Sequence, residues 1–115
     1  MSVNSQNTGA MEGGVAVRLG ELVTVAPGAI VSRTLVKGPA GTLTVFAFDE
    51  GQELSEHSAP FDAYVTVLDG TVLLTIGGQP VTASTGETVM MPANVPHAVR
   101  ATAPLKMLLT MIKNA

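Results

Sequence analysis

Residues 51–70 read GQELSEHSAPFDAYVTVLDG and residues 86–101 read GETVMMPANVPHAVRA, and these two stretches decide the fold. Each begins with a glycine and contains one histidine, His57 in the first and His97 in the second. The chain contains no other histidine. Pro96 directly precedes His97 and restricts how the chain enters the next segment. The two histidines are therefore the first candidates for chemistry in this chain.

Short β-prone runs separated by turn residues extend outward from these stretches. The runs are residues 22–25, 30–36, 42–48, 64–68, 71–76, 88–91, 98–102 and 105–112, with a further run from Val81. Turn signals recur about every 8–12 residues, which is typical of a β-sandwich or barrel. Asp69-Gly70, between two apolar runs, predicts a β-hairpin. No long window has a helical period free of Gly or Pro, so the chain is predicted to be all-β.

Both faces of the predicted strands are largely apolar. Along residues 42–48 and 64–68, apolar side chains occupy odd and even positions alike, whereas a strand in a solvated sheet has one polar face. Charged residues make up 13% of the chain, against about 25% in a typical soluble domain. We therefore expect the interior of a barrel on one face, and a second subunit or a covering strand on the other. The sequence predicts a homodimer.

Charge and composition exclude several classes of function. The net charge is −3 and the six Lys and Arg residues are scattered, so no nucleic-acid partner is expected. No apolar run reaches the roughly 18 residues of a membrane-spanning helix, so no membrane partner is expected either. The chain has no cysteine, which excludes disulfides, thiolate catalysis and zinc–thiolate sites.

The N-terminal residues differ in composition from the rest. Residues 1–14, MSVNSQNTGAMEGG, are polar and rich in glycine, and we expect a disordered tail there. Residues 15–115 are predicted to make up a single domain. The tail lacks the basic start and apolar centre of a signal peptide, so the expected location is cytoplasmic.

The two histidine-containing stretches resemble the two motifs of the cupin superfamily. Those motifs are G-x5-H-x-H-x3,4-E-x6-G and G-x5-P-x-G-x2-H-x3-N, and their glycines, the proline and one histidine in each recur here at the same spacing. The resemblance covers roughly residues 22–112 and is closest to the small single-domain cupins with one conserved barrel. It implies the cupin double-stranded β-helix, a jelly-roll barrel. It also implies pairing through N-terminal strands, which makes residues 30–36 the expected homodimer interface.

The resemblance also implies a metal site, which this chain matches only in part. The family takes two histidines and a carboxylate from the first motif and one histidine from the second. His57 fills the first position and His97 the last, but Ala59 and Ala63 occupy the other two. A divalent transition metal bound by His57 and His97, with water or Asp62 completing the shell, is one interpretation. The other is that Asp62 belongs to a solvated acidic edge and that no metal binds.

The same alignment implies a ligand pocket in the barrel, lined by His57, Ala59, Phe61, Ala63 and His97. The methionines are either core filler or an adaptable wall for an apolar ligand; the candidates are Met90, Met91, Met107 and Met111. We predict a small cupin with an incomplete metal-ligand set that binds a small molecule in its cavity. The alternatives are a metal-dependent dioxygenase or isomerase that uses His57 and His97, and metal-free acid–base catalysis by the two imidazoles. The sequence leaves open whether the protein is an enzyme.

Overall fold

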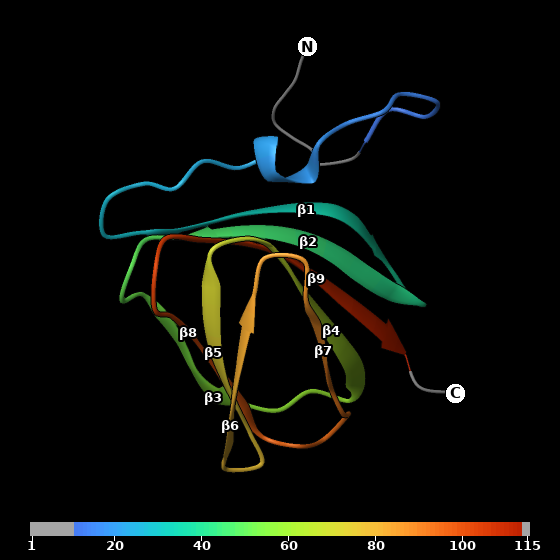
Figure 1. The fold of residues 1–115 in the computed structure, drawn as a ribbon. Coiled ribbons are helices and arrows are strands. Elements are labelled where there is room, and N and C mark those ends of the chain that lie inside the picture. The colour runs from blue at the N-terminus through green and yellow to red at the C-terminus, as the bar shows by residue number, and fades with distance from the viewer. Residues whose placement is uncertain (1–10, 114–115) are drawn as a thin grey trace.

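A computed structural model describes residues 11–113 of the chain, and within them two antiparallel β-sheets face each other across one core (Figure 1). The strands are β1 (Ile30–Gly38), β2 (Gly41–Phe48), β3 (Glu53–His57), β4 (Phe61–Asp69), β5 (Thr71–Ile76), β6 (Gln79–Ser84), β7 (Thr88–Met91), β8 (His97–Ala101) and β9 (Leu105–Lys113). One sheet has the order β1-β2-β9-β4-β7 and the other has the order β3-β8-β5-β6. The chain crosses repeatedly between the two sheets, as in a jelly roll. The predicted all-β barrel is therefore confirmed.

The core between the sheets is built by strict alternation along each strand. On β4 the inward positions Ala63, Val65 and Val67 are each at most 3% exposed. On β9, which pairs with β4, Leu105 and Met107 are each 1% exposed. Successive side chains of a strand point to opposite faces, so every second residue of these two strands contributes to the same apolar layer.

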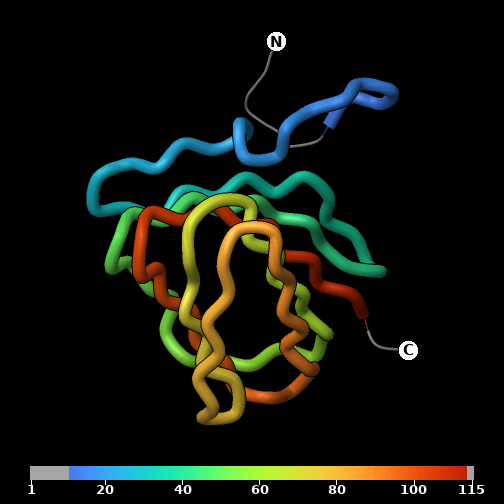
Figure 2. Tube along the Cα trace, viewed as in Figure 1, coloured from blue at the N-terminus to red at the C-terminus, as the bar shows by residue number. Residues whose placement is uncertain are grey.

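Residues 19–25, called the N-terminal segment below, cover part of the outer face of the five-stranded sheet and run along β1 (Figure 2). A short 3-10 helix, η1 (Leu19–Glu21), begins this cover, and Val23 packs at 5% exposure against Val45 and Ala47. Lys106 Nζ donates a hydrogen bond of 2.6 Å to the Gly20 carbonyl and ties the segment to β9. The second apolar face expected from the sequence is thus covered, over this area, by the same chain.

Two of the predicted strand assignments were wrong. Residues 22–25 do not form a strand, because this segment presents side chains to a sheet face and takes no place in a hydrogen-bonded ladder. Conversely, β3 was not predicted, since its sequence ELSEH contains two glutamates and a serine, which have low strand propensity. Pairing with β8 holds β3 extended despite that propensity.

The glycine turns at Asp69-Gly70 and Gly77-Gly78 differ in what they connect. Gly77-Gly78 joins β5 to β6 in a two-residue hairpin in which Ile76 pairs with Gln79. Asp69-Gly70 does not make a hairpin, because β4 belongs to the five-stranded sheet and β5 to the four-stranded one. Gly70 has φ +101° and lies so close to the Pro104 carbonyl that a Cβ atom would overlap its oxygen. Gly70 therefore lies where the chain crosses from one sheet to the other, too close to the Pro104 backbone for a side chain.

Most of the predicted tail, residues 1–10, lies outside the described residues, and residues 11–14 are exposed. The structure contains, within residues 11–113, no helix with the length and apolarity that a bilayer crossing requires.

We expect Gly70→Ala to destabilise the fold strongly. The positive φ costs a non-glycine residue about 1–2 kcal/mol, and forcing a methyl group against packed backbone adds about 1–3 kcal/mol. Gly86→Ala is the matched control, because Gly86 also has positive φ but a Cβ there meets no atom within 4 Å. Urea unfolding of both variants measures the difference. Equal losses of unfolding free energy would show that the contact with Pro104 is unimportant.

Candidate functional site

His57 and His97 lie opposite each other on neighbouring strands of the four-stranded sheet. His57 is the last residue of β3 and His97 the first of β8, and the two are direct partners in the antiparallel ladder. Their ring centroids are 4.5 Å apart, with the rings inclined at 70° in an edge-to-face contact. The structure therefore brings together two residues that are forty positions apart in the sequence.

A register shift in β3 gives His57 this position. Glu53 pairs with Arg100 and Leu54 with Val99, but the ladder then shifts by one residue before His57 pairs with His97. Continued without the shift, the ladder would set Glu56 opposite His97. A one-residue bulge reverses which side chains face inward. It thus turns the exposed His57 imidazole to the inner face of the sheet, where it lines the cavity, and leaves the Glu56 carboxylate on the outer face.

The loop before His97 is held by three backbone contacts. The Asn94 amide donates to the Ala59 carbonyl at 2.8 Å, and the Gly77 amide donates to the Pro96 carbonyl at 2.8 Å. The Ala93 amide donates to Asp62 Oδ1 at 2.9 Å. Asp62 therefore anchors the loop and does not line the cavity, contrary to the interpretation in which it completes a metal shell.

Hydrogen bonds to backbone determine the tautomer of both rings. His57 Nδ1 lies 2.9 Å from the Ser55 carbonyl oxygen and His97 Nδ1 lies 3.1 Å from the Val95 carbonyl oxygen. A carbonyl only accepts, so each Nδ1 must carry a proton and donate it. In the neutral ring Nε2 is then an unprotonated acceptor. Neither Nε2 has a hydrogen-bond partner among residues 11–113.

Both rings line a cavity of about 40 Å³ between the sheets. The lining residues are Leu54, His57, Ala59, Ala63, Val65, Met91, His97, Val99, Met107, Leu109 and Met111. No Asp, Glu, Lys or Arg is among them. His97 is 5% exposed, whereas His57 is exposed, so the cavity meets solvent at the His57 side.

Burial changes the acid–base behaviour of His97. Desolvation lowers the pKa of His97 below its usual 6.5, and the nearby His57 lowers it further. The hydrogen bond to the Val95 carbonyl opposes this by favouring the charged ring, but it is the smaller effect. His97 therefore favours the neutral form, with a free lone pair on Nε2.

Four of the five residues predicted for the pocket line this cavity: His57, Ala59, Ala63 and His97. The fifth, Phe61, is not a lining residue and lies half-buried at the start of β4, opposite Lys113. Met91, Met107 and Met111 line the cavity, but Met90 points outward at 46% exposure. The sequence interpretation missed Leu54 because β3 was not recognised as a strand; alternation along it would have indicated the inward position.

The side chains present do not fit the divalent metal that the family resemblance implies. Within the described part of the chain, no group of three or more His, Cys, Asp or Glu side chains could hold a metal ion. Ala59 and Ala63 supply only methyl groups, and Asp62 is engaged with the Ala93 amide. Catalytic metal sites normally use three protein ligands and keep one position open. Two imidazoles do not meet that requirement.

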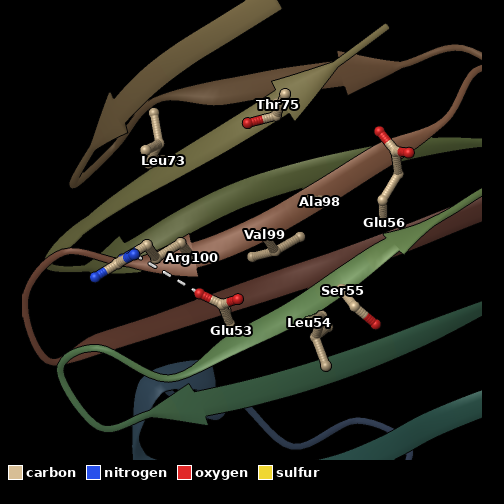
Figure 3. Close-up of a pocket in the computed structure, with 9 residues that line it drawn as sticks. All are labelled: Glu53, Leu54, Ser55, Glu56, Leu73, Thr75, Ala98, Val99 and Arg100. Atoms are coloured by element: carbon tan, nitrogen blue, oxygen red, sulfur yellow. Dashed lines mark ion pairs between the residues drawn. The ribbon is translucent and has the colours of Figure 1, made fainter. Parts of the chain in front are cut away.

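A second hollow, of about 370 Å³, lies on the outer face of the four-stranded sheet (Figure 3). Glu56, which the bulge turns outward, lines it, as do Glu53 and Arg100. Glu53 and Arg100 make an ion pair of 3.7 Å with both side chains 58% exposed. Exposed ion pairs of this kind contribute little. The histidine cavity, with its buried imidazole, is therefore the better candidate site.

Comparisons with known proteins agree with this geometry. A family model described as a cupin domain matches residues 44–112. A conserved protein of unknown function from Streptococcus pyogenes is 35% identical, covers 97% of this chain and 99% of its own, and has a TM-score of 0.88. A cupin 2 conserved barrel domain protein from Leptotrichia buccalis is 44% identical over 81% of this chain and 45% of its own, with a TM-score of 0.79. No curated protein matches the sequence.

We expect stability to fall as pH drops below about 6.5, the pKa of histidine in an unfolded chain. Because the pKa of folded His97 is lowered, the unfolded state binds more protons between that lowered value and about 6.5. Stability from neutral His97 is therefore complete above this window and lost on acidification through it. Urea unfolding at several pH values, with chelator present, measures the loss.

His97→Gln is the comparison, because glutamine is polar and does not titrate. The variant should lose less stability than the wild type over the same pH range. His57 and the carboxylates remain in both proteins, so their contributions cancel. Parallel stability curves for the two proteins would contradict the assignment of the pH dependence to His97.

Proposed function

The chain belongs to the cupin domain family, and we propose that this cupin binds a small molecule in the cavity that contains His57 and His97. The observation that carries the proposal is Nε2 of the buried His97, which has no hydrogen-bond partner within residues 11–113 and belongs to a cavity that is apolar apart from the two imidazoles. A buried polar atom without a hydrogen bond costs about 1–3 kcal/mol. A ligand that donates a hydrogen bond removes that cost.

The lining defines the class of ligand. Apart from the two imidazoles, the cavity walls are aliphatic or thioether side chains, so the body of the ligand is apolar. A volume of about 40 Å³ accommodates only a few non-hydrogen atoms, since one water needs roughly 10–15 Å³ on this scale. The donor group therefore sits between the imidazoles, and the body extends toward the open side at His57. Rotation of Met107 and Met111 can enlarge the space, because methionine is flexible.

The alanines at positions 59 and 63 favour small-molecule binding over metal-dependent catalysis. Ala59 and Ala63 face the cavity where the family's second histidine and carboxylate would stand. Removing both leaves two neutral nitrogen acceptors and no group that compensates a divalent charge. Such a pair recognises a neutral donor without requiring a cofactor.

Phenol and anisole are a matched pair of probes for this site. They share a ring, but only phenol donates a hydrogen bond, which is worth about 1 kcal/mol or roughly fivefold in affinity. We expect phenol to bind more tightly and to shift the Cε1–H resonances of both histidines in NMR titrations. Glu56→Gln, beside His57 but outside the cavity, should leave the titration unchanged, whereas His97→Phe should abolish it. Equal binding of the two probes would reject recognition by the imidazoles.

We also propose that the protein is a homodimer that associates through the outer face of the five-stranded sheet. Of the expected interface, residues 30–36, Leu35 is buried under the N-terminal segment and Val36 remains 54% exposed. Val36 begins a row that crosses all five strands in register, and its members are Val36, Leu43, Thr110, Tyr64 and Met90. Ile112, 49% exposed, extends this row. A second copy would remove the row from water.

The double variant Tyr64→Glu and Met90→Glu should yield a monomer, because it places two charges on neighbouring strands of the row. Sedimentation velocity at micromolar concentration measures the change from a dimeric wild type. Thr82→Glu, on an exposed position of β6 in the other sheet, is the control and should remain dimeric. A monomeric wild type would refute the dimer.

A further inference from the structure

Two methionines flank the position where the family resemblance places a carboxylate. Ala63 pairs with Met91 of β7 on one side and with Met111 of β9 on the other. Directly opposed residues of antiparallel strands have Cβ atoms about 4.5–5.5 Å apart, and a methionine side chain spans that distance. Both methionines line the same cavity as Ala63. Where the family has one hard oxygen donor, this chain has two soft sulfur atoms close by.

The thioethers and the imidazoles border one small space. Met91 is 2% exposed, and the cavity it shares with His57 and His97 measures about 40 Å³. A space of this size holds an ion with at most a few waters, since each water occupies roughly 10–15 Å³. The ring centroids lie 4.5 Å apart, so the two imidazoles border the same small space side by side. The donor set contains no carboxylate and no thiolate.

We infer that the cavity is a binding site for a soft monovalent cation, Cu(I), held by Nε2 of His57, Nε2 of His97 and the thioether sulfur of Met91 or Met111. Thioether sulfur selects Cu(I) over harder ions, and imidazole suits copper as well. The inference concerns the same cavity as the proposed function but a different occupant, and the two are tested independently.

Charge explains why a monovalent ion suits this site. The cavity lining contains no carboxylate that could neutralise a cation. The cost of moving an ion into a medium of low dielectric constant grows with the square of its charge, so a divalent ion pays about four times the penalty of a monovalent one. Neutral nitrogen and sulfur donors therefore hold Cu(I) at a smaller cost than Zn(II) or Fe(II).

The test is an anaerobic titration of the metal-free, full-length protein with Cu(I), buffered by a chromophoric competitor, and a parallel titration with Zn(II). We expect one Cu(I) per chain and weaker binding of Zn(II). X-ray absorption should detect both nitrogen and sulfur neighbours of the copper. The double variant Met91→Leu and Met111→Leu should lose at least the roughly tenfold affinity that removal of even an outer-shell partner costs.

Met90→Leu is the matched control, because Met90 is on the same strand as Met91 but points outward. Exchange of Met for Leu conserves volume and usually costs less than about 1.5 kcal/mol, and thermal unfolding of the metal-free variants checks that they fold. Two results would overturn the inference: a wild type that does not bind Cu(I), or a double variant that binds it as tightly as Met90→Leu does. In either case the methionines are core filler.

The phenol titration separates this inference from the proposed function. Histidine resonances that respond to phenol in a protein that ignores Cu(I) would overturn the copper site and leave small-molecule binding intact. Histidine resonances that respond to neither phenol nor Cu(I) would overturn both the copper site and the proposed small-molecule binding. Copper binding that requires the methionines, without any response to phenol, would retain the copper site and reject the neutral small molecule.

Discussion

The candidate site depends on the one-residue bulge between Leu54 and His57 in β3. A strand alternates between two environments, so one inserted residue exchanges them for everything that follows. With the bulge, His57 pairs with His97, and Glu56 lines the hollow on the outer face of the four-stranded sheet (Figure 3). Without it, a carboxylate would face His97, and the cavity would carry a charge. The apolar character of the cavity and the contact between the rings both follow from this single irregularity.

The rest of the barrel keeps that pair of strands in place. β8 lies between β3 and β5, and Ile76 of β5 pairs with His97 on the side opposite His57. The loop that leads into His97 is fixed from the other sheet by the Asp62 carboxylate. On the outer face of that five-stranded sheet, the N-terminal segment packs against Val45 and Ala47 and forms a second apolar layer. Both faces of the five-stranded sheet therefore resist displacement, which keeps the cavity small and its donors close together.

Sequence patterns predicted those parts of the fold that depend on local chemistry. The turn spacing indicated a barrel, and the two glycine–histidine motifs identified four of the residues that line the cavity. What the sequence did not predict depends on pairing between distant strands. Asp69-Gly70 has the composition of a hairpin, but the partners of β4 are β7 and β9. The short strand β3 has poor propensity and exists because β8 pairs with it. Phe61 was assigned to the pocket by motif position alone, and the bulge in β3 has no sequence signature.

The buried histidine links the geometry of the cavity to its chemistry. Desolvation disfavours the imidazolium form of His97, and the backbone carbonyl of Val95 fixes the proton on Nδ1. Both effects concern the lone pair on Nε2 of His97. Desolvation keeps that nitrogen unprotonated, and the hydrogen bond at Nδ1 directs Nε2 away from the Val95 carbonyl. His57 repeats the second arrangement with the Ser55 carbonyl, at the solvent side. The loss of the carboxylate at Ala63 is thus consistent with the rest of the site, because a negative charge there would raise the pKa of His97 and favour the protonated ring. A cavity without carboxylates keeps both nitrogen acceptors available, and such a site selects an occupant that donates a hydrogen bond or that is soft and of low charge.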